Sequence, residues 1–187
     1  MLFDHPYIPK VYDIIEDETY YYIVKDYLTG ITLRNLIKEK NHLSEKEVVE
    51  IALKVSDVLN YLNSLPTPII FGNINPNTII ISDPTNVSGN IKIIEIDPEK
   101  RKGCTELMGV VGYCPPEQYG GLVPLDHRVD IYGLGVTMHY MITGVNPCEP
   151  PYELWPIRQY NPDCAPRRRA DRLTGGNPVR KGLTNHR

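Results

Sequence analysis

The 187-residue sequence contains no N-terminal signal pattern, and none of its apolar runs approaches the ~18 residues that indicate a membrane-spanning helix. The sequence therefore predicts neither secretion nor a membrane span, and it favours a cytoplasmic protein. Hydrophobic residues make up 41% of the chain and charged residues 23%, which is ordinary for a globular domain.

The four cysteines form no C-x-x-C pair; they are Cys104, Cys114, Cys148 and Cys164. Structural zinc sites commonly draw two ligands from such a pair. We therefore expect free thiols in a reducing compartment rather than a metal site or disulfides.

Charge is unevenly divided along the chain. Residues 167–187 carry seven basic groups against one acidic group, a net charge of +6, whereas the other 166 residues carry 13 basic and 22 acidic groups, a net charge of −9. The C-terminal segment also has too few large apolar residues to build a core. We expect residues 167–187 to be a disordered basic tail. Because this tail lacks interleaved aromatic residues for base stacking, nucleic acid is not an expected partner.

The first half of the chain predicts a hairpin followed by two helices. Residues 11–16 and 20–24 are rich in β-branched and aromatic residues, and the polar turn between them suits a hairpin. Thr32 can cap a short helix that runs to Lys38. Ser44 and Glu47 then fit the capping box of a longer helix, whose apolar residues recur at three- and four-residue steps until Pro66.

The second half combines short strands, a long loop and further helices. The apolar runs 69–70 and 79–81 predict two strands around a polar loop, and residues 91–96 predict another strand. Residues 97–121 lack periodicity, which is typical of a long functional loop. Helices are expected over 129–143, ending at Gly144, and over 152–159.

The polar loop between the isoleucine runs resembles the protein-kinase catalytic loop, whose motif reads H-R-D-L-x-x-x-N. Other kinase landmarks follow in the family's order. His5-Pro6-Tyr7-Ile8 resembles the lead into the fourth strand of the small lobe, and residues 22–30 resemble the fifth strand and hinge. Residues 109–121 resemble the end of an activation segment, with Pro115-Pro116-Glu117 at the A-P-E position, and residues 130–136 resemble the start of the central large-lobe helix.

Residues 5–162 are thus similar to protein kinases, particularly bacterial Ser/Thr kinases. The resemblance implies an α+β, protein-kinase-like fold. Residues 1–30 would form a partial small lobe, two strands plus the hinge, and residues 31–166 a truncated, mainly helical large lobe before the tail. The family's glycine-rich loop, ATP-binding Lys and partner Glu lie upstream of the fourth strand, and the sequence starts too late to contain them.

The resemblance also places substitutions at the reacting positions. Asn73 stands at the catalytic base, and a carboxamide cannot accept a proton at neutral pH. Asn75 replaces a Lys near the transferred phosphate and supplies no charge. The degenerate metal positions are Thr78, at the metal-binding Asn, and Glu95, at the first residue of the D-F-G motif.

Nucleotide-binding and structural positions follow from the same resemblance. The candidates for the hinge and adenine pocket are Lys25, Asp26, Leu28 and Ile80, with Lys25 at the normally uncharged gatekeeper. Four positions are expected to be structural. Phe71 and Ile96 match the regulatory hydrophobic spine, and Asp130 matches the Asp that hydrogen-bonds the catalytic-loop backbone. Glu117 matches a family Glu that pairs with a later Arg; because the segment expected to supply that Arg is absent or replaced by the basic tail, we expect Glu117 to be solvated or differently paired.

Three interpretations remain open at this point. The leading one is a catalytically inactive pseudokinase with a scaffolding or regulatory role, whose partner is a protein such as an active kinase. The second is an atypical Ser/Thr kinase that uses Glu95 and Thr78 for Mg²⁺. The third is a non-functional remnant. ATP and Mg²⁺ are the cofactors that the resemblance implies, and the substitutions at residues 73, 75 and 78 weaken the case for both.

Overall fold

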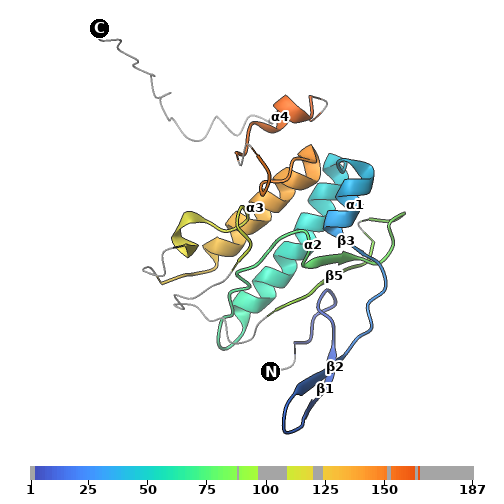
Figure 1. Ribbon diagram of the computed structural model, residues 1–187, viewed down its shortest axis with the longest axis vertical. Helices are drawn as coiled ribbons and strands as arrows, with labels where there is room; N and C mark the ends of the chain where they lie inside the picture. Colours follow the sequence, from blue (N-terminus) through green and yellow to red (C-terminus); the bar gives the residue numbers. More distant parts are fainter. Residues whose placement is uncertain are drawn as a thin grey trace.

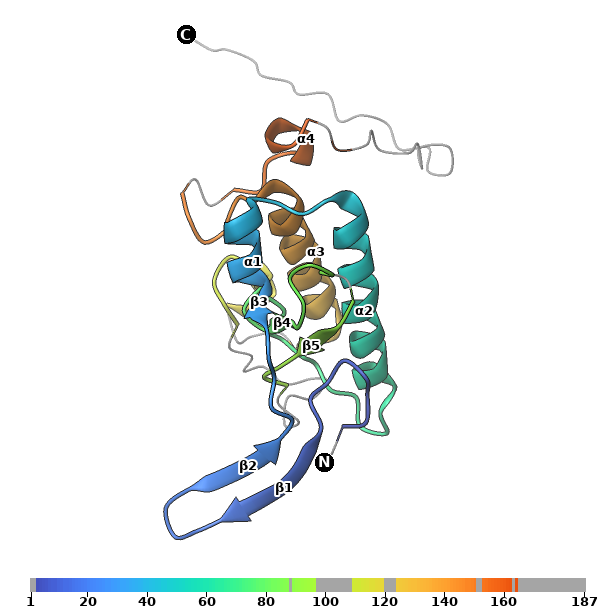
Figure 2. The ribbon, with the colours of Figure 1, turned by 90° about the vertical axis from the view of Figure 1, so that its right-hand side faces the viewer.

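The computed structural model describes residues 3–87, 89–96, 109–119, 124–150, 153–162 and 164. It has an α+β architecture, with a mainly helical body and a two-stranded hairpin that projects from it (Figures 1 and 2). Much of the predicted loop 97–121 and the whole predicted tail 167–187 lie outside the described residues.

The predicted hairpin is present as strands β1 (Val11–Glu16) and β2 (Tyr21–Lys25), which pair antiparallel. Its turn is closed by Asp17, whose carboxylate accepts hydrogen bonds from the backbone amides of Thr19 and Tyr20. The Asp17 amide in turn donates to the Tyr20 carbonyl at 3.0 Å. Tyr20 therefore belongs to the turn, and β2 begins one residue later than predicted.

Two capped helices follow, as the sequence predicts. Helix α1 (Leu33–Lys40) begins after Thr32, whose side chain accepts a hydrogen bond from the Asn35 amide. Helix α2 (Glu45–Ser64) carries the complete capping box of Ser44 and Glu47. It ends before Pro66 because a proline disfavours the helical conformation in the residue that precedes it.

A three-stranded antiparallel sheet in the order β3-β4-β5 lies beside the helices. Strand β4 (Ile79–Ile81) pairs with β3 (Ile31–Thr32) on one side and with β5 (Ile91–Ile93) on the other. The outer residues of β4 and β5 are buried and the middle ones half-buried, so the sheet turns one face to the core. Strand β3 was not predicted because two residues carry no periodicity.

Two strand predictions are wrong. Residues 69–70 contain only an isolated β-bridge at Ile69; its amide donates to the Leu62 carbonyl, which holds the segment against the end of α2. Both isoleucines are buried, so the apolar run reflects burial rather than a strand. Strand β5 ends at Ile93 rather than at residue 96, because Glu95 adopts a positive φ of 66° that breaks the extended run.

Helix α3 (Arg128–Thr143) packs along α2, and their apolar faces form the centre of one core cluster (Figure 2). Gly144 ends α3 in the left-handed conformation, with φ 70°. A 3₁₀ turn, η1 (Pro116–Gln118), and helix α4 (Ile157–Tyr160) complete the described elements. Helix α4 starts later than the predicted 152–159 because Pro156 keeps the preceding residue out of the helical region.

No helix within the described ranges is long and apolar enough to cross a membrane. Cys114 is buried and Cys148 and Cys164 are half-buried, whereas Cys104 lies outside the described residues.

Replacing the α2 cap tests the local signal at the start of this helix. We expect Ser44→Ala to lower the free energy of unfolding by about 1 kcal/mol, because the Glu47 amide loses its acceptor. Urea unfolding measures the change. The control is Ser56→Ala, an exposed position within the same helix, for which little change is expected. Equal stability of Ser44→Ala and the wild type would contradict the prediction.

Candidate functional site

The loop from Phe71 to Thr78 is fastened to the body through Asp130, near the start of α3. The Asp130 carboxylate accepts a hydrogen bond from the Phe71 amide at 3.0 Å and another from the Gly72 amide at 2.6 Å. Asp130 is only 4% exposed, and hydrogen bonds to a buried carboxylate are strong. This is the contact that the kinase resemblance implies for Asp130. Gly72 itself has φ 69°, a conformation that a glycine adopts without strain.

A second anchor comes from η1. The Gln118 side-chain amide donates to the Gly72 carbonyl at 3.0 Å, so this residue is held from both its amide and its carbonyl. Gln118 was not singled out in the sequence, since a lone glutamine beside the Pro-Pro-Glu motif carries no pattern. The contact joins two segments 46 residues apart and becomes visible only in the fold.

The three substituted catalytic-loop residues hydrogen-bond to one another. The Asn75 side-chain amide donates to the Asn73 carbonyl at 2.8 Å and to the Asn73 side-chain oxygen at 3.1 Å. The Thr78 hydroxyl donates to the Asn75 carbonyl at 2.9 Å and accepts from the Asn75 amide at 3.3 Å. The Asn75 side-chain oxygen also accepts from the Asn77 amide. These side chains therefore brace the loop.

This network counts against the candidate metal position at Thr78. Asn75 and Thr78 are each 1% exposed, and the hydroxyl proton of Thr78 already points at a backbone carbonyl. Glu95 is exposed and directly follows Ile94, whose amide donates to the Thr78 carbonyl at 2.9 Å. Within the described parts of the chain, no three His, Cys, Asp or Glu residues gather as a metal site. The bonds and burial of the Thr78 hydroxyl thus count against the Mg²⁺ position that the resemblance implies there.

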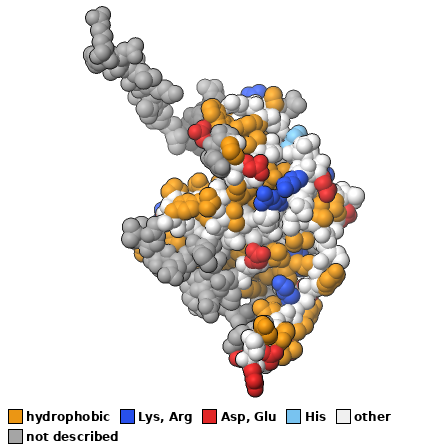
Figure 3. All heavy atoms as spheres, in the orientation of Figure 1, with side chains coloured by type: hydrophobic (Ala, Val, Ile, Leu, Met, Phe, Trp, Pro, Cys, Tyr) orange, Lys and Arg blue, Asp and Glu red, His pale blue; other side chains and the backbone are white. Residues whose placement is uncertain are grey.

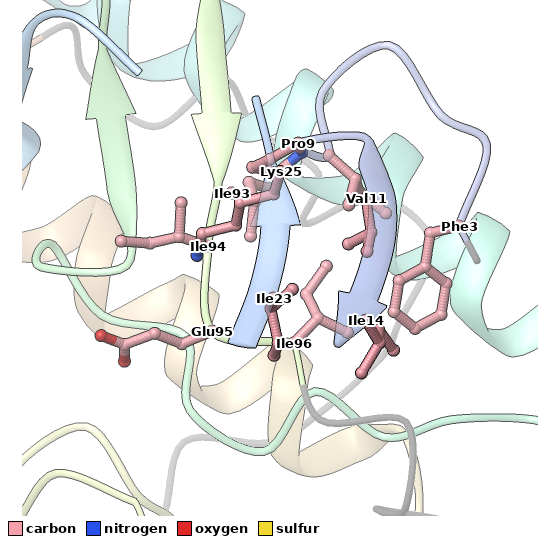
Figure 4. Close-up of a pocket in the computed structure, with 11 residues that line it drawn as sticks. Phe3, Pro9, Val11, Ile14, Ile23, Lys25, Ile93, Ile94, Glu95 and Ile96 are labelled. Carbon is pink, nitrogen blue, oxygen red and sulfur yellow. The ribbon is translucent and has the colours of Figure 1, made fainter. Parts of the chain in front are cut away.

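An apolar pocket of about 270 Å³ lies between the hairpin and the segment after β5 (Figure 4). Ile14, Ile23 and Lys25 line it from the hairpin, and Ile93 to Ile96 line it from the body. Of the four candidate nucleotide-binding residues, only Lys25 is part of this lining. Figure 4 shows the Glu95 carboxylate directed away from the cluster of isoleucines.

Asp26, another of these candidates, joins the hinge to the strands on either side. Its carboxylate accepts from the Tyr12 hydroxyl at 2.6 Å and from the Lys10 amide at 2.9 Å, and the Lys92 ammonium lies 4.0 Å away. The hydrogen bond from Tyr12, followed by that from Lys10, lowers the pKa of Asp26 below its ordinary value. Asp26 therefore acts as a clamp at the base of the hairpin.

The remaining two nucleotide-binding candidates lie outside the pocket lining. Leu28 is half-buried. Ile80 is half-buried and pairs across the sheet with Lys92. The Lys92 ammonium donates to the carbonyls of Pro6 and Ile8, so a cation lies on the sheet face that was expected to form the floor of an adenine site.

The other structural candidates occupy different environments. Phe71 is completely buried in the main core cluster, and Ile96 packs against that cluster while half-buried. Glu117 is exposed, and no ion pair to it is found among the described residues. The nearby cation Arg128 instead bonds to Asp126, and this interaction lowers the pKa of Asp126 to about 2.

The fold and this anchored loop define the large-lobe scaffold of a protein kinase. The family model described as "Protein kinase domain" matches residues 1–156. The chain therefore belongs to the protein kinase domain family.

Similar proteins include bacterial serine/threonine-protein kinases. The chain is 31% identical to PrkC of Bacillus subtilis over 148 residues, which cover 75% of this chain and 22% of PrkC. It is 31% identical to PknB of Mycobacterium tuberculosis over 157 residues, covering 80% of this chain and 24% of PknB. A probable serine/threonine-protein kinase of Clostridium acetobutylicum is 30% identical over 142 residues, which cover 75% of this chain and 21% of that kinase. The chain thus spans about a fifth to a quarter of the length of these relatives.

The role of Asp130 can be tested by removing its charge. We expect Asp130→Asn to lower the free energy of unfolding by about 3 kcal/mol, because an amide offers only one acceptor to the two buried backbone donors. Urea unfolding measures this loss. Glu39→Gln, at an exposed position of α1, is the control. A loss in Asp130→Asn no larger than in the control would contradict the anchoring role.

The Asp26 clamp predicts a dependence of hairpin stability on pH. Because the folded-state pKa of Asp26 is lowered, its contribution is complete above the unfolded-state pKa of about 3.9 and is lost as the pH falls through the folded value. Hydrogen exchange at the hairpin amides should therefore be faster in Asp26→Asn than in the wild type at pH 7, and the two should converge in acid. A difference that is constant from neutral to acidic pH would rule out the clamp.

Proposed function

We propose that this chain is a catalytically inactive protein-kinase-like domain that acts by binding a protein partner. The observation that carries the proposal is the closed network of Asn73, Asn75 and Thr78. Side chains that a kinase would direct at substrate, phosphate or metal are bonded here to their own loop.

Phosphoryl transfer requires a positioned substrate hydroxyl and cationic groups or metal ions that neutralise charge on the phosphates. Asn73 cannot accept the substrate proton, Asn75 has no charge, and the Thr78 hydroxyl is buried. The supports of the loop, by contrast, are in place through Asp130 and Gln118. This combination supports a role for the scaffold that does not depend on the reaction.

The partner we propose is an active serine/threonine kinase, the class to which the named relatives belong. The apolar pocket beside the hairpin supports binding of a protein, because most of its lining side chains are apolar. By binding an active kinase, the inactive domain would act by positioning that kinase and not by transferring phosphate itself.

One observation favours an atypical kinase instead. Glu95 keeps an exposed carboxylate at the position of the D-F-G aspartate, where a hard cation would find an oxygen ligand. This hypothesis requires the Thr78 network to open when metal binds.

The third hypothesis, a non-functional remnant, predicts that the purified chain does not unfold cooperatively.

The first test is thermal unfolding with ATP, with and without Mg²⁺. A ligand at about 100 times its Kd would stabilise the chain by about 2.7 kcal/mol. We expect a cooperative transition and no Mg²⁺-dependent shift, because the Thr78 hydroxyl is buried and already bonded within its own loop. We also expect no transfer of labelled γ-phosphate to a generic protein substrate, with an active serine/threonine kinase as the positive control.

Glu95→Gln provides the matched variant. A Mg²⁺-dependent shift and phosphate transfer in the wild type, both lost in Glu95→Gln, would overturn the proposal in favour of the atypical kinase. A chain without cooperative unfolding would point to the remnant.

A further inference from the structure

The β1–β2 hairpin exposes large apolar side chains on both faces. Ile14 and Ile23 pair on the face that lines the apolar pocket, yet they are 57% and 59% exposed. The opposite face exposes Ile15, Tyr20, Tyr22 and Val24. A lone two-stranded hairpin is marginally stable in water, and exposed apolar patches indicate association. Figure 3 shows apolar side chains on the projecting end of the molecule, with acidic groups at its tip.

The outer edge of β1 is protected from pairing. A register shift between Val11 and Asp13 interrupts this strand, and bulges of this kind discourage further strand addition. The Ile14 amide already donates to the Asp13 carboxylate at 2.9 Å. Glu16 adds a second negative charge along the same strand. A new strand is therefore not expected on this side.

The outer edge of β2 is open by comparison. The Asp26 amide donates to the Lys10 carbonyl and the Tyr20 carbonyl accepts from the Asp17 amide, so the backbone groups of residues 20 and 26 face β1. Along an antiparallel strand, the backbone amide and carbonyl of successive residues point alternately toward one neighbouring strand and away from it. The amides and carbonyls of residues 21, 23 and 25 therefore point away from β1. Within the described ranges, β2 pairs with no strand other than β1.

We propose that this edge of β2 pairs antiparallel with β2 of a second copy of the chain, about a two-fold axis at Ile23. The result is a four-stranded sheet in the order β1-β2-β2-β1 across the two copies. Ile23 lies opposite its counterpart, and Lys25 lies opposite residue 21 of the other copy. Both pairs fall at positions whose backbone groups face outward, so each can exchange two hydrogen bonds.

The charge pattern of β2 favours a second copy as the occupant. This strand contains one charged residue, Lys25, and the proposed register places it opposite an uncharged tyrosine. No like charges meet, whereas an unrelated strand would have to match the pattern by chance. The apolar faces also continue across the axis, since Ile23 meets Ile23 on one face and Tyr22 meets Val24 on the other.

The area of the proposed interface sets the expected affinity of the dimer. The exposed parts of the apolar side chains amount to roughly 500 Å² per copy. Edge-to-edge pairing covers only part of this area, so the interface is smaller than the ~800 Å² per partner of a standard interface. We therefore expect a reversible dimer that forms at micromolar concentrations. Since pairing consumes the open β2 edges and β1 is protected, association stops at two copies. This inference does not depend on whether the domain is catalytically active.

Sedimentation velocity and light scattering of the full 187-residue chain, from about 1 to about 200 µM, provide the test. We expect the mass to rise from one chain to two and no further. Ile23→Lys and Ile23→Glu each place like charges opposite each other at the axis, so each should weaken self-association at least about tenfold.

Mixing the two variants makes the test specific for the register. Opposite charges at position 23 should restore a mixed dimer, which only a strand that pairs with itself at this residue can explain. Restoration also shows that neither variant has merely unfolded. The control is Leu53→Lys on α2, which replaces a similarly exposed aliphatic residue far from the hairpin and should leave dimerisation unchanged.

Three results would overturn the proposal. They are a wild-type chain that stays monomeric over the whole range, a dimer that persists in both variants, and assembly into larger polydisperse species. A monomer that instead binds a strand-forming peptide of another protein would assign the same edge to a different occupant.

Discussion

The buried carboxylate of Asp130 is the constraint on which the loop at the centre of this domain depends. It holds the amides of Phe71 and Gly72 across 58 or 59 residues of chain, and it lies on α3, whose apolar face packs into the same core as α2. Burying this charge is tolerable because backbone donors satisfy it. The position of the loop is thus coupled to the packing of the two longest helices.

The loop keeps its anchoring contacts while its side chains differ from those of the kinase motif. In the corresponding loop of a kinase, a carboxylate contacts the substrate and a cation contacts the phosphate. In this chain Asn73 and Asn75 are neutral and bond to each other, and Thr78 joins them through two backbone contacts. Amide and hydroxyl groups can satisfy one another inside a loop at little electrostatic cost, whereas charged groups would need solvent or a ligand.

The hairpin contrasts with this well-packed body. Asp26 closes the base of the hairpin through Lys10 and Tyr12. Lys92 of β5 links this base to the body, since its ammonium lies 4.0 Å from the Asp26 carboxylate and donates to the carbonyls of Pro6 and Ile8. These polar contacts set its position, but they leave its apolar faces open to solvent. Polar anchoring at the base, exposed isoleucines along the strands and one unprotected edge together favour completion of the sheet by another chain.

Signals that act within a few residues could be predicted from the sequence. The Ser44 capping box, the apolar stripe of α2 and the turn at Asp17 each depend on neighbours along the chain, and the structure contains all three. Strand β3, the Gln118 contact and the early end of β5 could not be predicted, because they depend on partners distant in sequence or on a single backbone angle. Residues 69–70 were mistaken for a strand since burial produces the same apolar run. The sequence by itself determined the capped helices, the hairpin and the missing catalytic charges. Only the tertiary structure decided that the substituted side chains bond to one another, because hydrogen-bond partners are chosen by the folded geometry of the loop.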